Sequence, residues 1–163
     1  MCTSPFHVAF HAPIDVGAKG RAPRPILHVR APWHPPRADR IDVVIDPRQA
    51  FGTGAHPTTR LCLSMLEEIA DQGALDGATV LDVGCGSGIL AIAALRLGAA
   101  RALGVDTDPV AIEAPLANAR RNALARRLHA TPGSLPVADG PYDVVLANLI
   151  AGVLVPLAPD LRH

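Results

Sequence analysis

The sequence predicts an α/β fold with a doubly wound parallel sheet, and three observations support this prediction. From residue 79 onward, segments with strand and helix character follow one another as strand, helix, strand, helix, strand, strand. A glycine-rich turn at residues 84–88 joins the first of these strands to the first helix. The second strand is short and ends on Asp106, about 20 residues after the turn, which is a spacing typical of nucleotide-binding α/β units.

Composition limits the possible classes of protein. The chain has 163 residues, of which 49% are hydrophobic and 18% charged, and its formal net charge is zero. These values are typical of one globular domain with a sizeable core. Because binding to phosphates needs uncompensated cations, the neutral balance argues against direct contact with nucleic acid or a membrane surface. No leader-like or membrane-spanning apolar run is present in the sequence, so we expect a cytoplasmic protein.

Cysteine and histidine spacing predicts neither a disulfide framework nor a metal site. The three cysteines, Cys2, Cys62 and Cys85, are widely spaced and include no C-x-x-C pair. The seven histidines show no ligand spacing on a recognisable helix. Cys85 lies inside the glycine-rich turn, where we expect it to pack as a small apolar side chain and not to act as a nucleophile.

The N-terminal part of the chain differs in composition from the rest. Residues 1–40 are rich in proline, glycine and histidine, which predicts a linker or the remnant of another domain, with one strand at residues 25–29. The main domain is expected to span residues 41–163 and to open with a strand at residues 41–45.

A loop with two glycines and three threonines, at residues 50–59, leads into the first expected helix. Leu61, Met65, Leu66 and Ile69 share one side of this helix, so we expect that side to face the core. Gly73 is expected to end the helix.

The glycine-rich turn at residues 84–88, which follows the strand that begins at residue 79, has the pattern of a cofactor-binding loop. Gly84, Gly86 and Gly88 let the backbone turn sharply and approach a ligand closely, and the free N–H groups of the next helix face the bound molecule. A dinucleotide loop follows G-x-G-x-x-G, whereas these glycines follow G-x-G-x-G, with Asp82 two residues ahead of them. This pattern favours a small zwitterionic nucleoside, and S-adenosylmethionine is the candidate. A glycine triplet alone is also compatible with a plain strand-to-helix turn.

The helix at residues 89–97 is apolar nearly all round, which predicts burial between the sheet and another element.

Two acidic residues follow the second strand. Asp106 can accept hydrogen bonds from both ribose hydroxyls of a nucleoside, and it disfavours NADP because it would repel a 2′-phosphate; the alternative is a solvated turn acid. Asp108 is expected to cap the next helix, since Pro109 suits a first helical position. That helix is expected to extend to about residue 127 with a kink or break at Pro115, where proline costs roughly 3 kcal/mol.

The fourth strand, at residues 142–147, leads directly into Asn148. Ligands of open α/β sheets bind beyond the carboxyl ends of the strands, so we expect Asn148 beside the reactive end of the cofactor. Its amide has one acceptor oxygen and two donor hydrogens, which can hold an incoming amine or the amino-acid part of the cofactor. The alternative is an asparagine that closes the strand and caps the next helix.

Four segments together resemble the PrmA family, the methyltransferases that modify a protein of the large ribosomal subunit. The resemblance extends over about residues 26–160. The segments that carry it are A-F-G-T-G-A-H-P-T-T at residues 50–59, V-L-D-V-G-C-G-S-G-I-L at 80–90, G-V-D-T-D-P at 104–109 and A-N-L-I-A-G at 147–152.

This resemblance implies a Rossmann-like class I methyltransferase that uses S-adenosylmethionine to methylate lysine side chains and an N-terminal amine of the ribosomal protein. The family's motifs imply cofactor contacts by Thr59, Gly84, Asp106 and Asn148. Asn148 would also align the attacking amine, which makes it the candidate catalytic residue. Phe51 and the turn at residues 52–54 would lie over the methionine end of the cofactor.

Two departures from the family leave alternatives open. Family members carry a separate N-terminal domain that holds the ribosomal protein, and residues 1–40 are too short and too rich in proline to replace it. The family's sheet also continues for three further strands, so we expect a sheet that is incomplete at its C-terminal side, with the fourth strand as an edge. One alternative is a class I methyltransferase with a non-protein acceptor. The other is a truncated remnant that binds the cofactor without catalysis.

Overall fold

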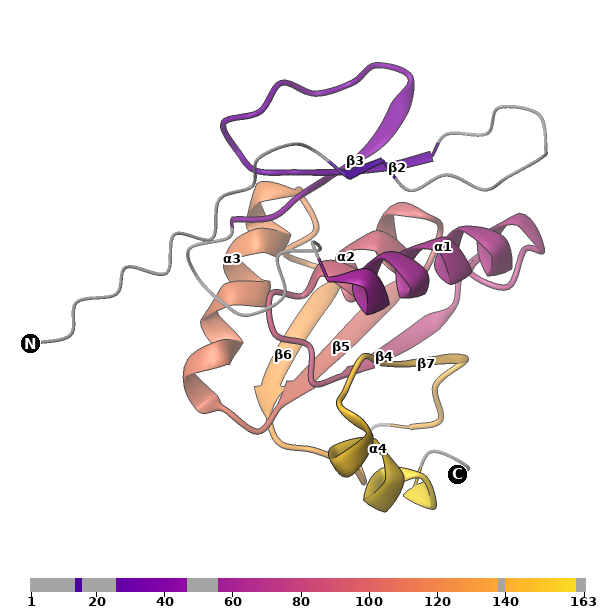
Figure 1. The fold of residues 1–163 in the computed structure, drawn as a ribbon, viewed down its shortest axis with the longest axis vertical. Coiled ribbons are helices and arrows are strands. Elements are labelled where there is room, and N and C mark those ends of the chain that lie inside the picture. Colours follow the sequence, from indigo (N-terminus) through magenta and orange to yellow (C-terminus); the bar gives the residue numbers. More distant parts are fainter. Residues whose placement is uncertain (1–13, 16–25, 47–55, 138–139, 161–163) are drawn as a thin grey trace, which may run out of the picture.

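The computed structural model describes residues 14–15, 26–46, 56–137 and 140–160, which form two sheets and the helices packed against them (Figure 1). The larger sheet contains β4 (Thr79–Val83), β5 (Arg101–Asp106), β6 (Leu128–Pro132) and β7 (Val144–Ala147). Its order is β6-β5-β4-β7, and all neighbours are parallel. The strand order therefore reverses beside β4, which confirms the predicted doubly wound α/β fold and places a ligand-binding crevice at the carboxyl end of this strand.

The smaller sheet contains β1 (Ile14–Asp15), β2 (Ile26–Arg30) and β3 (Arg40–Val44), in that order. β2 and β3 are parallel, and both lie within one residue of the strands predicted from the sequence. The domain division predicted between residues 40 and 41 consequently falls inside β3, after its first residue, and would separate β2 from most of the strand with which it pairs.

One hydrophobic core joins the two sheets. It includes Leu27 from β2, Val43 from β3 and Leu128 from β6, together with α2 (Ile89–Arg96), in which residues 89–95 are all buried. α2 contacts β3 on one side and β4 and β5 on the other. The prediction that this helix is buried between the sheet and another element is confirmed.

Helix α1 (Pro57–Asp71) turns a different side toward the core from the one predicted from its apolar residues. Leu66 is buried as expected, but Leu61 and Met65 are 62% and 56% exposed. The buried residues of α1 are Thr59, Leu63 and Leu66. On the same side, Glu67 accepts a hydrogen bond from the backbone N–H of Leu27 at 2.6 Å. The prediction was wrong for Leu61 and Met65 because it counted only apolar residues, whereas polar side chains that bond to other elements also determine how a helix is turned. The helix ends as predicted, with Gly73 in the left-handed region at a φ of 78°.

The predicted helix over residues 109–127 is divided and shorter. A 3₁₀ turn, η1 (Pro109–Ile112), is capped as expected by Asp108, whose carboxylate accepts from the N–H of Val110 at 2.9 Å. α3 (Glu113–Arg121) follows, so the break precedes Pro115, which occupies the first turn of α3, where a missing N–H removes no intrahelical bond. α4 (Ala151–Leu157) completes the described helices. None of these helices is long and apolar enough to cross a membrane.

Candidate functional site

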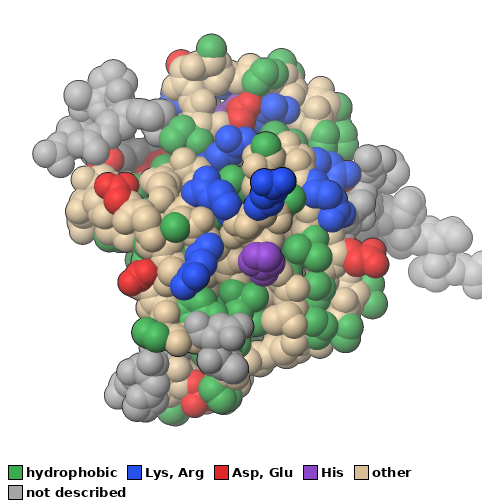
Figure 2. All heavy atoms as spheres, turned by 180° about the vertical axis from the view of Figure 1, so that it is seen from behind, with side chains coloured by type: hydrophobic (Ala, Val, Ile, Leu, Met, Phe, Trp, Pro, Cys, Tyr) green, Lys and Arg blue, Asp and Glu red, His purple; other side chains and the backbone are tan. Residues whose placement is uncertain are grey.

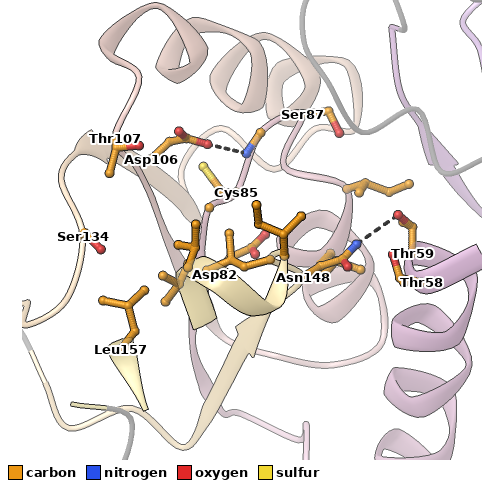
Figure 3. A pocket seen from close by; sticks show the side chains of 18 of the residues that line it. Thr58, Thr59, Asp82, Cys85, Ser87, Asp106, Thr107, Ser134, Asn148 and Leu157 are labelled. Atoms are coloured by element: carbon orange, nitrogen blue, oxygen red, sulfur yellow. Dashed lines mark hydrogen bonds between the residues drawn. The ribbon is translucent and has the colours of Figure 1, made fainter. Parts of the chain in front are cut away.

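A cavity of about 780 Å³ lies beyond the carboxyl ends of β4, β5 and β7 (Figure 3). Its lining comes from the start of α1, the glycine-rich turn, the end of β5, residues 133–134 and the segment from Asn148 through α4. The volume falls within the roughly 300–1,000 Å³ of small-molecule sites. The cavity therefore occupies the position predicted for a nucleoside cofactor.

The three glycines of the turn have different surroundings. Gly84, Gly86 and Gly88 have φ angles of 70°, 49° and 76°, in the region that favours glycine. Gly84 and Gly86 line the cavity, and the Leu149 side chain lies where a Cβ on Gly84 would project. Gly88 is not among the lining residues. A Cβ there would lie 2.7 Å from the Cβ of Pro115, so Gly88 allows α3 to pack against the turn.

Asp106 is held in place by the backbone at the end of β5. Its Oδ2 accepts from the N–H of Gly86 at 3.0 Å, and its Oδ1 accepts from the N–H of Asp108 at 3.1 Å. The side chain is half-buried and faces the cavity (Figure 3). Since each carboxylate oxygen has more than one lone pair, both oxygens retain capacity for a ligand hydroxyl.

Asp82 is a buried carboxyl on the wall of the same cavity. It accepts a hydrogen bond from the N–H of Ala91 at 3.1 Å and is 2% exposed. Burial, with a further contribution from the nearby charge of Asp106, raises the pKa of Asp82 to about 7 despite the bond from the Ala91 N–H. No lysine or arginine occurs among the described lining residues. The cavity thus favours a positively charged ligand over a phosphate.

The structure brings Thr59 and Asn148 together from distant parts of the chain. Asn148 directly follows β7, and its Nδ2 donates to the Oγ1 of Thr59 on α1 at 3.1 Å (Figure 3). Thr59 is buried, and both residues line the cavity. Asn148 does not cap the next helix, because the N-cap of α4 is Ile150. The capping part of the alternative is therefore wrong, whereas Asn148 does directly follow the end of β7.

His56 lies beside this pair as the N-cap of α1. Its Nδ1 accepts from the N–H of Thr58 at 3.3 Å and is 2.7 Å from the Thr58 Oγ1. With Nδ1 acting as an acceptor, a neutral imidazole carries its proton on Nε2 and presents a donor. The expected contacts of Phe51 and residues 52–54 lie outside the described residues.

Sequence reasoning did not identify the α4 side of the cavity. Ile150, Val153 and Leu157 line the cavity on this side. The signal in the sequence was the apolar segment that follows Asn148.

Cys85 packs as predicted, because its side chain is buried. Burial, together with the nearby Asp82 and Asp106, raises the pKa of its thiol to about 12. The described residues contain no group of three or more metal-ligating side chains.

The face of the molecule opposite to that of Figure 1 carries several exposed arginines around one histidine, and it does not show the cavity (Figure 2). None of the described arginines is among the residues that line the cavity.

Comparison with known proteins supports the predicted family. The model of the family described as "Ribosomal protein L11 methyltransferase (PrmA)" matches residues 19–163. The ribosomal protein L11 methyltransferase of Edwardsiella ictaluri (strain 93-146) is 54% identical over 124 residues, which cover 76% of this chain and 41% of the relative. That of Ectopseudomonas mendocina (strain ymp) is 53% identical over 132 residues, which cover 79% of this chain and 43% of the relative. The chain thus spans less than half the length of these relatives.

Solved structures show the same fold. A ribosomal protein L11 methylase from Lactobacillus delbrueckii subsp. bulgaricus matches with a TM-score of 0.72 at 34% identity, covering 83% of this chain and 69% of that one. An RNA methyltransferase from Salinibacter ruber, solved in complex with S-adenosyl-L-homocysteine, matches with a TM-score of 0.52 at 27% identity, covering 60% of this chain and 65% of that one. The Rossmann-like class I methyltransferase fold is confirmed, and the chain belongs to the ribosomal protein L11 methyltransferase (PrmA) family.

Proposed function

We propose that this chain binds S-adenosylmethionine in the cavity and transfers its methyl group to amino groups of ribosomal protein L11. The observation that carries the proposal is the charge of the cavity. Two carboxyl groups, Asp82 and Asp106, lie on its wall, and the described lining includes no lysine or arginine. S-adenosylmethionine carries a sulfonium and an ammonium group, which such a wall attracts, whereas a dinucleotide brings phosphates that it repels.

The residues at the turn fit the sugar and base of this cofactor. Asp106 retains lone pairs on both oxygens, and we assign it the ribose hydroxyls. Gly84 and Gly86 line the cavity without a side chain, which permits close approach of the nucleoside to the backbone. We assign the positive charge of the methionine part to Asp82, since a nearby cation offsets the cost of ionising a buried carboxyl.

The Thr59–Asn148 pair fits the methionine and acceptor end. When bound, the cofactor supplies an electrophilic methyl group on sulfur. Asn148 keeps its Oδ1 and one amide hydrogen after bonding to Thr59. In our proposal the Oδ1 accepts a hydrogen from the neutral attacking amine and aligns its lone pair with the methyl group. Such alignment contributes roughly 7–11 kcal/mol in well-oriented reactions, more than the about 4 kcal/mol needed to deprotonate a lysine near pH 7.5.

We assign no general base. His56 carries its proton on Nε2 when neutral, because its Nδ1 accepts from Thr58. The apolar side chains of Val153 and Leu157 also line the cavity, and an apolar lining suits the aliphatic part of a lysine side chain. A ribosomal substrate also supports a cytoplasmic location.

Two measurements on the full chain test the proposal. Calorimetric titration should show micromolar binding of S-adenosylmethionine and S-adenosylhomocysteine and no comparable binding of NADP. Radiolabelled methyl transfer should occur to purified ribosomal protein L11 and not to ribosomal RNA. Preferred binding of NADP would contradict the cofactor assignment. Transfer to RNA would support the class I methyltransferase with a non-protein acceptor, and cofactor binding without any transfer would support the non-catalytic remnant.

A further inference from the structure

Two buried asparagines, one in α3 and one at its C-cap, connect the helix to the glycine-rich turn and to the region of β3. Asn118 and Asn122 lie about one helical turn apart and are 0% and 1% exposed. A buried amide that loses a hydrogen-bond partner destabilises the fold by about 1–3 kcal/mol, so the partners of these side chains indicate what each residue contributes.

Asn122 pairs with the backbone of β3. Its Oδ1 accepts from the N–H of Val44 at 2.9 Å, and its Nδ2 donates to the carbonyl oxygen of Val44 at 2.7 Å. The same Nδ2 also donates to the carbonyl oxygen of Asn118 at 2.8 Å. The amide thus occupies the free edge of β3 much as a neighbouring strand would. None of these bonds reaches the glycine-rich turn.

Asn118, in contrast, connects the glycine-rich turn to the end of β3. Its Nδ2 donates to the carbonyl oxygen of Ser87 at 3.0 Å, and its Oδ1 accepts from the N–H of Asp46 at 3.0 Å. Ser87 lies between two glycines of the turn. The carboxylate of Asp46 is also paired with Arg121 of α3, at 3.0 Å between Oδ2 and Nη2. A single side chain therefore bonds to two segments that are separate in sequence.

A second contact holds the turn against the same side of α3. Pro115, three residues before Asn118, packs closely against Gly88. A Cβ added to Gly88 would lie 2.7 Å from the Cβ of Pro115. α3 thus contacts two consecutive residues of the turn, Ser87 and Gly88. The residue before them, Gly86, donates its N–H to Asp106. A displaced Ser87 would consequently move the Gly86 N–H away from the Asp106 carboxylate.

We propose that Asn118 is a positioning residue for the cofactor-binding turn. It holds the Ser87 carbonyl so that Gly86 and Asp106 keep their relative places, and it links the turn to the smaller sheet through Asp46. Asn122 stabilises β3 without this effect on the turn. The consequence for affinity rests on the proposed binding of S-adenosylmethionine, whereas the consequence for the turn itself does not.

Matched isosteric variants test the proposal. In Asn118→Asp the side chain still accepts from Asp46 but can no longer donate to Ser87. Asn122→Asp likewise retains the bond from Val44 N–H and loses its donor bonds. Both variants place a carboxylate at a buried site, so both should lower the midpoint of urea unfolding. Only Asn118→Asp should raise the dissociation constant for S-adenosylmethionine by about tenfold to a hundredfold, because small displacements in a binding site have effects of this order. Asn122→Asp should stay within about threefold of the parent chain.

Amide hydrogen exchange provides a readout that needs no ligand. Asn118→Asp and Asn118→Ala, which adds no charge, should both speed exchange at residues 86–91, whereas Asn122→Asp should speed it in β3 only. Equal effects of the Asn118 and Asn122 variants on the turn would overturn the proposal. If the parent chain binds no S-adenosylmethionine, the proposed function fails, and the exchange pattern still decides whether Asn118 positions the turn.

Discussion

The two ends of the cavity are built in different ways. At the turn, Asp106 and Asp82 accept hydrogen bonds from backbone N–H groups 20 and 9 residues away in sequence. At the other end, Asn148 and Thr59 are 89 residues apart, and one bond between their side chains joins them. α4, which completes that end, has no buried residue. The two carboxyl groups at the turn are therefore held by bonds within one strand–turn–helix–strand unit, whereas the acceptor end depends on how distant elements pack.

Replacing Asp106 should have the largest effect on cofactor binding. Asp106→Ala removes a charged acceptor that we assign to two ribose hydroxyls, each bond contributing about 1.5–3 kcal/mol. We expect the dissociation constant for S-adenosylmethionine to rise about a hundredfold or more, measured by calorimetry. Asp108→Ala is the matched control, because it removes a nearby carboxylate that caps η1. It should cost about 1 kcal/mol of stability and leave affinity within a few-fold. Equal losses of affinity would contradict the assignment.

Replacing Gly88 should cause the next largest effect, this time on stability. Gly88→Ala places a Cβ in the left-handed region and 2.7 Å from the Cβ of Pro115. The conformational cost of about 1–2 kcal/mol and an overpacking cost of at least about 1 kcal/mol predict a loss of roughly 2–3 kcal/mol in the free energy of unfolding. Gly77 has a similar φ of 72°, and nothing lies within 4 Å of the position that its Cβ would take. Gly77→Ala should therefore lower the free energy of unfolding only by the conformational cost of about 1–2 kcal/mol. Urea unfolding of the two variants measures the difference, and equal losses would rule out the contact with α3 as its source.

The difference between short-range bonds at the turn and long-range bonds at the acceptor end also explains which parts of the structure could be predicted from the sequence. The strand at residues 79–83, the turn, the buried α2 and the acid that ends β5 were all predicted correctly, because apolar periodicity and glycine spacing act over short stretches. The Asp108 cap was also predicted from adjacent residues. Within this unit, local chemistry and final structure agree.

Contacts between distant segments could not be derived in this way. The exposed positions of Leu61 and Met65 follow from the packing of α1 on α2 and β2, which no local pattern records. The roles of Asn118 and Asn122 likewise depend on Asp46, which follows β3, and on Val44 of β3, 72 and 78 residues earlier in the chain. A polar residue in a helix gives no sign in the sequence of which backbone group it will meet, so these bonds appear only in the folded structure.

Titration of Asp82 should make both the stability of the fold and the affinity for the cofactor depend on pH, with a smaller effect than the substitutions above. Its folded-state pKa of about 7 lies above the ordinary value of 3.8, so the folded state binds the proton more tightly than the unfolded chain. This contribution to stability is complete below about pH 4 and is lost as the pH rises toward 7. A cationic ligand favours the ionised form, so its affinity should increase from pH 6 to pH 8, by up to about tenfold.

Asp82→Asn tests this dependence, because an amide of the same shape does not titrate. The variant should show a flatter profile both for urea unfolding between pH 4 and 7 and for S-adenosylmethionine binding between pH 6 and 8. Titration of the cofactor's own amine affects both proteins equally, so the difference between the two binding profiles isolates Asp82. Identical profiles would show that Asp82 does not titrate in this range.

The bond between Thr59 and Asn148 should contribute least, about 1 kcal/mol, because it joins two uncharged groups. Thr59→Val keeps the shape of the side chain and removes the acceptor, so Asn148 loses its orientation. We expect kcat for methyl transfer to fall about fivefold, because the attacking amine is then less well aligned. Thr59→Ser should retain most of the rate. Thr58→Val is the neighbouring control, since its hydroxyl contacts His56 and not Asn148. In combination with Asn148→Ala, Thr59→Val should add almost no further loss. Full additivity of the two changes would mean that Thr59 does not act through Asn148, and the acceptor end would then have to be held by α4 alone.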